Sequence, residues 1–311
     1  MVTDFRSDNG QRPDRAPHDR YQQHATARRH DRRGAARGPA PRLAAHLAGV
    51  ERGHTELAES HRVIAPDLRG LGDSTRAATG YDVSTLAADV LGRLDALDTS
   101  PAAVVGIDAG SPVAFMMAMR SPRRVARLVM MESLLGSLPG AEEFLTGGPP
   151  WWFGFHSVPG LAETVLVGHE ADYVNWFLEQ GTRGRGAPPT VRDAIAAAYT
   201  GTDSLRCGFA YYRSAPTNNR KITEALARSR LTVPTLAIGA ATVGDALFRQ
   251  LSPIADDLIG QVIPDCGHII PLDRPRALLD LLSPFLVEPE PLHEGVDRGD
   301  APTSVPSSST R

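Results

Sequence analysis

Short apolar runs alternate with amphipathic segments of helical length between residues 62 and 287. The apolar runs occupy residues 63–65, 102–105, 128–131, 235–238 and 262–263. Helical patterns occupy residues 83–97, 112–119, 246–258 and 275–282. Strands that alternate with helices are typical of βαβ units, in which the strands pair in parallel through right-handed crossovers. The pattern therefore predicts an α/β fold with a mostly parallel sheet.

A long segment without a strand pattern separates the third apolar run from the fourth. Residues 134–230 contain several helical segments and most of the aromatic residues of the chain. A loop of this length without secondary structure is uncommon in a compact domain. We therefore expect a helical insertion that lies over the sheet as a lid, between two parts of the core at 56–133 and 231–287.

The two ends of the chain differ from this core in composition. Residues 1–50 contain ten Arg, five Asp and no Glu, a local charge of +5 in a chain whose net charge is −3. Residues 1–41 offer almost no apolar side chains to bury, and burial is what offsets the entropy of ordering a chain. We predict a disordered Arg-rich segment at 1–55 and a disordered tail at 288–311. A basic arm that binds nucleic acid is the alternative for the first segment.

The overall composition excludes several classes of protein. No stretch approaches the roughly 18 apolar residues that a membrane span requires, so we expect no membrane insertion. No apolar core of a signal peptide follows Met1, which predicts a cytoplasmic location. The two cysteines, Cys207 and Cys266, cannot form a disulfide scaffold or a cysteine-rich metal site. The net charge of −3 argues against a dedicated nucleic-acid binder.

The strongest chemical signal is the segment Gly106-Ile107-Asp108-Ala109-Gly110, which follows an apolar strand and precedes a helix. This placement is typical of the G-x-nucleophile-x-G elbow of the α/β-hydrolase fold, with Asp108 as the nucleophile. A carboxylate is ionised at pH 7, so it needs no base before it attacks carbon. The product is an ester between enzyme and substrate, which a base-activated water must then hydrolyse. The backbone N–H of Ala109 is the candidate donor to the oxyanion.

His268, which follows the last apolar run, is the candidate base. A surface-loop histidine is the alternative, but a His just after the last strand is where this fold closes its catalytic triad. The loop after residues 235–238 offers no acid before Asp245. Glu132 ends the third strand among apolar neighbours, where a carboxylate needs a partner. We favour Glu132 over Asp245 as the third member, since an acid at a helix N-terminus explains Asp245 equally well.

These motifs together resemble the epoxide hydrolase-like branch of the α/β-hydrolase superfamily. The resemblance rests on A-P-D-L-R-G-L-G-D-S at residues 65–74, the elbow around Asp108 and D-C-G-H at 265–268. It extends over roughly residues 60–287 and implies an α/β-hydrolase fold with a helical lid. The chain looks closest to the subgroup that places its acid on the third of these strands, which supports Glu132.

The resemblance also implies lid residues that donate hydrogen bonds to the epoxide oxygen. One is a Tyr just before Arg in a lid helix, which here is Tyr212, with Tyr211 beside it. The second, a His or Tyr in related lids, falls near residues 151–153, where Trp152 stands with His156 nearby. Tyr212 is therefore the candidate donor, and Trp152, Tyr211 and His156 are candidates for the substrate pocket. Simple packing of lid aromatics is the alternative for the two tyrosines.

Strands before Arg62 and an H-G-x-P turn that completes the oxyanion hole are also implied, but the sequence lacks both. Residues 41–50 read P-R-L-A-A-H-L-A-G-V instead. Back-translation of residues 41–56 with permitted codons, read one base out of frame, allows H-G-W-P-H-T-W-R-E-W-S-A-V-I-P. The family pattern then resumes at Glu56. We hypothesise that residues before about 55 are translated in a shifted frame, which leaves the N-terminal strands missing.

Three functions remain open at this stage. The first is a hydrolase that opens a small apolar epoxide to a diol, its activity reduced by the absent turn. The second is a haloalkane or haloacid dehalogenase with the same Asp108 and His268. A strongly basic residue after the nucleophile would favour haloacids as substrates, but the residue after Asp108 is Ala109, which is not basic. The third is an inactive hydrolase relative or a binding protein. None of them implies a metal or an organic cofactor, and a homodimer is compatible with each.

Overall fold

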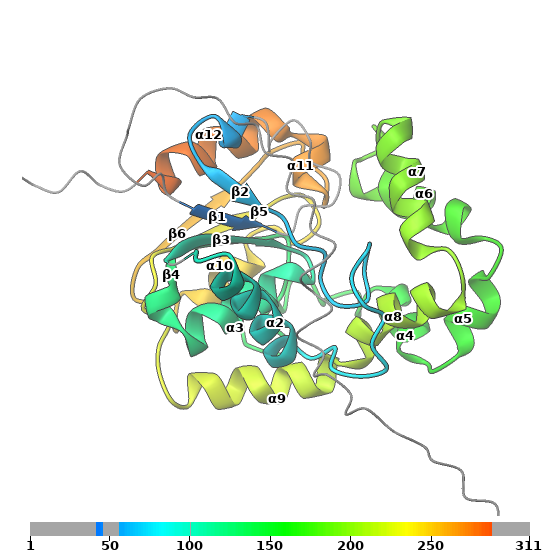
Figure 1. The fold of residues 1–311 in the computed structure, drawn as a ribbon, viewed down its shortest axis with the longest axis horizontal. Coiled ribbons are helices and arrows are strands. Elements are labelled where there is room, and N and C mark those ends of the chain that lie inside the picture. Colours follow the sequence, from blue (N-terminus) through cyan, green and yellow to red (C-terminus); the bar gives the residue numbers. More distant parts are fainter. Residues whose placement is uncertain (1–41, 46–55, 100, 288–311) are drawn as a thin grey trace, which may run out of the picture.

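One parallel sheet forms the centre of the protein. The computed structural model describes the backbone of residues 42–45 together with residues 56–99 and 101–287. Within them the strands form a six-stranded sheet of order β2-β1-β3-β4-β5-β6, in which every neighbouring pair is parallel (Figure 1). The strands are β1 (Arg42–Ala45), β2 (Arg62–Ile64), β3 (Ala102–Ile107), β4 (Val125–Met131), β5 (Thr235–Gly239) and β6 (Leu258–Val262). The predicted α/β fold with a mostly parallel sheet is confirmed.

The start of the sheet differs from the sequence prediction, which placed no strand before Arg62. β1 lies between β2 and β3 and pairs with both, with Leu43 opposite Val63 on one side and opposite Ala103 on the other. Without β1, β2 and β3 would each present unpaired backbone groups along the facing edges of the sheet. The predictions for residues 1–41, 46–55 and 288–311, including disorder, the shifted frame and the absent turn, lie outside the described residues.

Both faces of the sheet are buried, as expected when a parallel sheet carries helices on each side. Successive residues of β3 alternate between two hydrophobic clusters, with Val104 in one and Val105 in the other. The first cluster packs against α2 and α3, and the second against α12. These helices are α2 (Val83–Ala96), α3 (Gly110–Arg120) and α12 (Pro275–Leu286).

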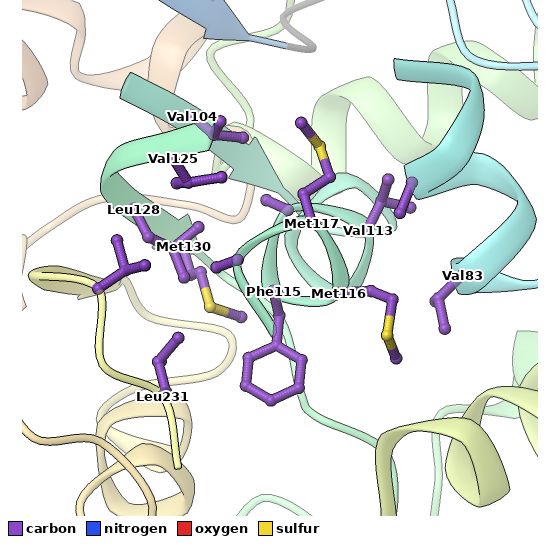
Figure 2. Packing of buried hydrophobic residues seen from close by; sticks show 14 of the residues in the cluster. Val83, Val104, Val113, Phe115, Met116, Met117, Val125, Leu128, Met130 and Leu231 are labelled. Atoms are coloured by element: carbon purple, nitrogen blue, oxygen red, sulfur yellow. The ribbon is translucent and has the colours of Figure 1, made fainter. Parts of the chain in front are cut away.

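Helix α3 is the most deeply buried of these helices. Eight of its eleven residues are buried, and Phe115 has no exposed surface. Figure 2 shows Phe115, Met116 and Met117 projecting from α3 between the strand that carries Leu128 and the helix that carries Val83. A helix that is apolar on nearly every side belongs inside a core. This burial fixes the N-terminal end of α3, where the predicted nucleophile lies.

The helix predicted over residues 246–258 is shorter in the structure. α10 spans Ala246–Leu251, and Leu258 already begins β6, which pairs with β5. Pro253 contributes to the early end, because proline lacks the N–H that a continuing helix requires. The apolar positions around Leu258 therefore belong to a strand and not to a helix.

The segment between β4 and β5 contains the helices α4 to α9, and α4 to α8 lie to one side of the sheet in Figure 1. α9 was assigned to the lid from the sequence, but it packs beneath α2 and α3 and buries Ile222 in the first core cluster. Helices α4 to α8 are called the lid helices below, and the division of the chain into a core and a lid stays a prediction from the sequence. The helices are α4 (Trp151–Ser157), α5 (Leu161–Leu166), α6 (Glu170–Gly181), α7 (Pro189–Tyr199), α8 (Thr202–Arg213) and α9 (Ala215–Leu226).

Helix α8 ties the lid to the loop that follows β2. The phenol of Tyr211 donates a hydrogen bond to the carbonyl of Arg69 at 2.8 Å. The guanidinium of Arg76 donates to the hydroxyl of Ser204 at 3.0 Å. Two contacts from different turns of one helix fix its rotation, and with it the direction of the next residue along, Tyr212.

Candidate active site

Asp108 occupies a sharp turn between β3 and α3. Its φ of +49° is in the left-handed region, which costs energy for a residue with a side chain and is typical of the hydrolase elbow. A Cβ at Gly106 would lie 2.5 Å from the carbonyl oxygen of Gly110, so only glycine fits there. The Asp108 N–H donates to the carbonyl of Met131 at 3.1 Å. The turn therefore holds the Asp108 carboxylate, 63% exposed, at the carboxyl edge of the sheet.

The structure brings Asp108, His268 and Glu132 together from three separate segments. The Nε2 atom of His268 lies 3.8 Å from Oδ1 of Asp108. Its Nδ1 atom lies 3.1 Å from Oε2 of Glu132, within hydrogen-bond distance. The imidazole thus stands between a solvent-accessible carboxylate and a buried one. This is the geometry of a nucleophile, a base and a residue that orients the base.

Glu132 is held as an acceptor by the loop after β5. Its side chain has no exposed surface, and its Oε1 accepts the N–H groups of Ala240 and of Val243, the latter at 3.3 Å. Backbone donors stabilise a buried carboxylate that water cannot reach. The loop after β5 therefore supplies backbone N–H groups to Glu132, which directly follows the neighbouring strand β4. Asp245, the alternative, pairs with Arg249 at 2.8 Å on the surface.

The two carboxylates determine the charge of His268. Burial disfavours the imidazolium, but hydrogen bonding and charge attraction from Asp108 and Glu132 outweigh it and raise the pKa of His268 to about 10. Below that pH the free protein therefore holds His268 as a cation between two anions. A neutral His268, able to accept a proton from water, requires the loss of one of these negative charges.

Ala109 lies at the N-terminal end of α3, directly before its first residue, Gly110. The backbone N–H groups in the first turn of a helix have no partner within the helix and carry a partial positive charge. Ala109 thus stands where its N–H can face an anion that forms at Asp108. The structure places this predicted oxyanion donor next to the nucleophile.

The two lid tyrosines have different surroundings. The phenol of Tyr211 bonds the carbonyl of Arg69, so Tyr211 joins the lid to the core. Tyr212 is half-buried among lid aromatics, with its ring centroid 4.5 Å from that of His156. Burial, and to a smaller extent the negative charge of Asp108, raise the pKa of Tyr212 well above its ordinary value.

The other predicted pocket residues belong to an aromatic cluster in the lid. The His156 ring is buried, stacks on Phe209 at 4.4 Å and bonds Tyr173 through Nε2 at 2.7 Å. Burial, with a smaller effect of the Arg213 charge, lowers the pKa of His156 to about 4, so this histidine is neutral. Trp152 packs against Phe177 at 5.5 Å. The ring that contacts Tyr212 from the segment at 151–153 is Phe153, at 5.6 Å, and not Trp152.

Tyr199, at the C-terminal end of α7, was not predicted from the sequence. Its ring covers Gly208 of α8, where an added Cβ would lie 2.7 Å from the ring. Burial and then the charge of Asp108 raise the pKa of Tyr199 to about 12. Gly208 lies one helical turn before Tyr212 in α8. A glycine inside a helix indicates that another group packs closely on it, and this was the sequence signal for Tyr199.

Two further properties concern membrane spans and metal sites in the residues that the structure describes. No helix within them is long and apolar enough to cross a membrane. No group of three or more His, Cys, Asp or Glu side chains within them is arranged to hold a metal ion.

Comparison with known proteins supports a hydrolase. Residues 54–275 match the family model of the alpha/beta hydrolase fold. The chain is 30% identical over 249 residues to the soluble epoxide hydrolase of Corynebacterium sp. (strain C12), covering 74% of this chain and 82% of that protein. It is 44% identical over 244 residues to the 2-hydroxymuconate semialdehyde hydrolase of Pseudomonas sp. (strain CF600), covering 75% and 79%. The crystal structure of Cfl2 from Burkholderia cenocepacia superposes with a TM-score of 0.71 at 28% identity, covering 81% of this chain and 90% of that one.

Proposed function

Because the chain belongs to the alpha/beta hydrolase fold family, we propose that it is a hydrolase that opens a small apolar epoxide to a diol through a covalent ester on Asp108. The observation that carries the proposal is a carboxylate at the elbow, 3.8 Å from an imidazole that a buried glutamate orients at 3.1 Å. An alkyl ester of this carboxylate is stable enough to be an intermediate and labile enough for an activated water.

The first step breaks the strained ring. Asp108 attacks one ring carbon, and the C–O bond of the epoxide opens toward the lid. The phenol of Tyr212 donates a hydrogen bond to the departing oxygen and transfers its proton as the alkoxide forms. A phenol suits this role because it supplies a proton to a strongly basic alkoxide without carrying a charge into an apolar pocket.

The second step hydrolyses the ester. His268 takes a proton from water, and the resulting hydroxide attacks the ester carbonyl of Asp108. The N–H of Ala109 stabilises the oxyanion of the tetrahedral intermediate. Collapse of that intermediate releases the diol and restores the Asp108 carboxylate.

Ester formation itself prepares His268 for the second step. The esterified Asp108 has lost its charge, so one of the two anions that raise the pKa of His268 to about 10 is gone. The pKa of the imidazole falls, and its proton leaves to solvent, from which the phenolate left on Tyr212 by the first step regains a proton. His268 then becomes a base only when there is an ester to hydrolyse.

The surroundings of Tyr212 favour an apolar substrate. Phe153 contacts its ring at 5.6 Å, and the neutral His156 lies on another side of it. Trp152 and Tyr211 extend this lining in our proposal. The similarity to the soluble epoxide hydrolase of Corynebacterium supports the same class of substrate. The homodimer and the cytoplasmic location stay predictions from the sequence.

The proposal is tested by trapping the ester. Removing the base in His268→Gln leaves ester formation possible and stops hydrolysis, so incubation with styrene oxide is expected to add the mass of one styrene oxide to the peptide that contains Asp108. The double variant Asp108→Asn, His268→Gln is the control and should stay unmodified. The native protein should release phenylethanediol.

Two other outcomes identify the alternative functions. Halide release from a bromoalkane by the native protein, without diol from any epoxide tested, would assign the same residues to a dehalogenase. No adduct on Asp108 with either class of compound would mean that the chain is an inactive relative or a binding protein.

A further inference from the structure

The C-terminal end of lid helix α6 contacts the loop that carries His268 at Gly181. The N–H of Ile269 donates to the carbonyl of Gly181, the last residue of α6, at 2.8 Å. A Cβ at Gly267 would lie 2.4 Å from that same carbonyl oxygen, and a Cβ at Gly181 would lie 2.7 Å from Ile269. Two glycines thus allow the lid to touch the residues on both sides of His268.

A buried carboxylate holds the same loop from the opposite direction. Asp273 follows His268 by five residues, and its side chain has no exposed surface. It accepts the N–H of Gly267, directly before His268, and the guanidinium of Arg185 at 2.8 and 3.1 Å. Asp273 is thereby fully occupied as an acceptor between the histidine loop and the lid.

Arg185 connects this carboxylate to the lid segment that follows α6. Its guanidinium donates to the carbonyl of Thr182 at 3.3 Å and to Oδ2 of Asp265 at 2.9 Å, in addition to Asp273. Neighbouring Arg183 differs, because its side chain is half exposed and approaches only Asp265, at 3.4 Å. Of these two arginines, which Gly184 separates, only Arg185 pairs with the buried carboxylate of Asp273.

We propose that Arg185 and Asp273 are positioning residues that hold His268 against Asp108, so that the contact of the end of α6 and Arg185 with the histidine loop is required for hydrolysis of the ester but not for its formation. The inference rests on the proposed function above. Attack by Asp108 needs no base, whereas hydrolysis needs the imidazole in place. A displacement of about 1 Å in a reacting group can slow its step by about 100-fold. Loss of the Arg185–Asp273 pair therefore slows only the second step.

The test separates the two steps by quenched-flow kinetics with styrene oxide, following ester on Asp108 by mass spectrometry and diol by chromatography. In Arg185→Gln and in Asp273→Asn, ester hydrolysis is expected to fall by about 10- to 100-fold, while ester formation stays within about threefold of the native rate. The ester therefore accumulates in the steady state. Arg185→Lys keeps the cation and is expected to recover most of the loss.

Arg183→Gln is the matched control, since it removes the same charge from the same lid segment without touching Asp273. It should behave as the native protein does. Equal slowing of both steps in Arg185→Gln and Asp273→Asn, unchanged hydrolysis in them, or the same defect in Arg183→Gln would each overturn the positioning role. Absence of ester on Asp108 in His268→Gln, together with no diol from the native protein, would instead remove the proposed function, and the inference with it.

Discussion

The pKa of His268 offers a direct measure of the charge on Asp108. We predict that Asp108→Asn, which removes the charge and keeps the size of the side chain, lowers the pKa of His268 from its value of about 10. The substitution imitates the ester, because both are neutral at the same position. The variant therefore reports the state of His268 in the intermediate without any substrate.

The size of the change follows from the distance between the two charges. Nε2 of His268 and Oδ1 of Asp108 are 3.8 Å apart. Unit charges at that distance interact by about 1 kcal/mol in water and about 4 kcal/mol at an effective dielectric constant near 20. Asp108 is 63% exposed, so solvent screening keeps the attraction within these limits. At about 1.4 kcal/mol for each pKa unit, the pKa of His268 falls by about 1 to 3.

The measurement is a pH titration of the His268 Cε1–H resonance in protein labelled at histidine, with His268→Gln to assign the signal. The native resonance should titrate near pH 10, and that of Asp108→Asn between about pH 7 and 9. Asp245→Asn is the control and should not move it, because Asp245 pairs with Arg249 at the surface. A native pKa near the ordinary 6.5, or an unchanged value in Asp108→Asn, would refute the reasoning.

The rate of ester hydrolysis should rise with pH. A raised pKa means that His268 is protonated at all pH values below about 10 in the free protein, and only the neutral form can accept a proton from water. In the ester the pKa is lower, so the rate of hydrolysis should rise with pH through the value found for Asp108→Asn. Single-turnover hydrolysis of preformed ester between pH 5 and 10 measures this rise.

Three further predictions concern other residues. Glu132→Gln removes the charge that orients His268 and should slow ester hydrolysis by about 10²- to 10⁴-fold, measured as diol release, while Asp245→Asn stays near the native rate. Tyr212→Phe removes the oxygen donor and should slow ester formation by about 10²- to 10³-fold in quenched flow, with hydrolysis of the ester unaffected. Phe115→Ala empties a fully buried position and should lower the free energy of unfolding by about 3 to 5 kcal/mol in urea titration; a loss below about 1 kcal/mol would contradict the packing described for α3.

Local sequence signals sufficed where the chain itself marks the geometry. Gly106 stands two residues before Asp108, where a Cβ would lie 2.5 Å from the carbonyl oxygen of Gly110, and His268 follows a short apolar run and a glycine. Glu132 was identifiable as a charge among apolar neighbours, a position that requires partners. Each of these features depends on a few consecutive residues, so the sequence displays it directly.

Features that depend on contacts between distant segments were not predictable. In the sequence, Asp273 looks like an ordinary acid near the start of a helix. Its proposed positioning role depends on Arg185, which lies 88 positions earlier. The ring of Tyr199 lies over Gly208 only because α7 packs on α8. The four residues of β1 carry too short a pattern to identify a strand, and their place between β2 and β3 is set by the pairing needs of those neighbours.

β1 also defines what the shifted-frame hypothesis means for activity. Its last residue, Ala45, pairs with Val105 of β3, so the chain leaves β1 at the sheet edge where Asp108 lies. The family match begins at residue 54, close to Glu56, where the hypothesis places the return to the original frame. Sequencing of the gene tests the hypothesis directly, because a clean reading with no insertion or deletion relative to related genes would exclude it.

The same offset over residues 33–40 allows G-G-P-P-V-V-L-L, whose V-V-L-L run can replace the strand β1 (Arg42–Ala45). Replacement of residues 33–55 by the frame-restored G-G-P-P-V-V-L-L-H-G-W-P-H-T-W-R-E-W-S-A-V-I-P, with Glu56 kept, tests the consequence for catalysis. If the H-G-x-P turn supplies the second donor to the oxyanion beside the N–H of Ala109, the replacement should speed ester hydrolysis by about 10²- to 10³-fold. The same replacement in Asp108→Asn is the control and should stay inactive, since an oxyanion hole has no effect without an ester. Equal rates of ester hydrolysis before and after replacement would show that the chain as written already stabilises its oxyanion, and the absent turn would then be no reason to expect weak activity.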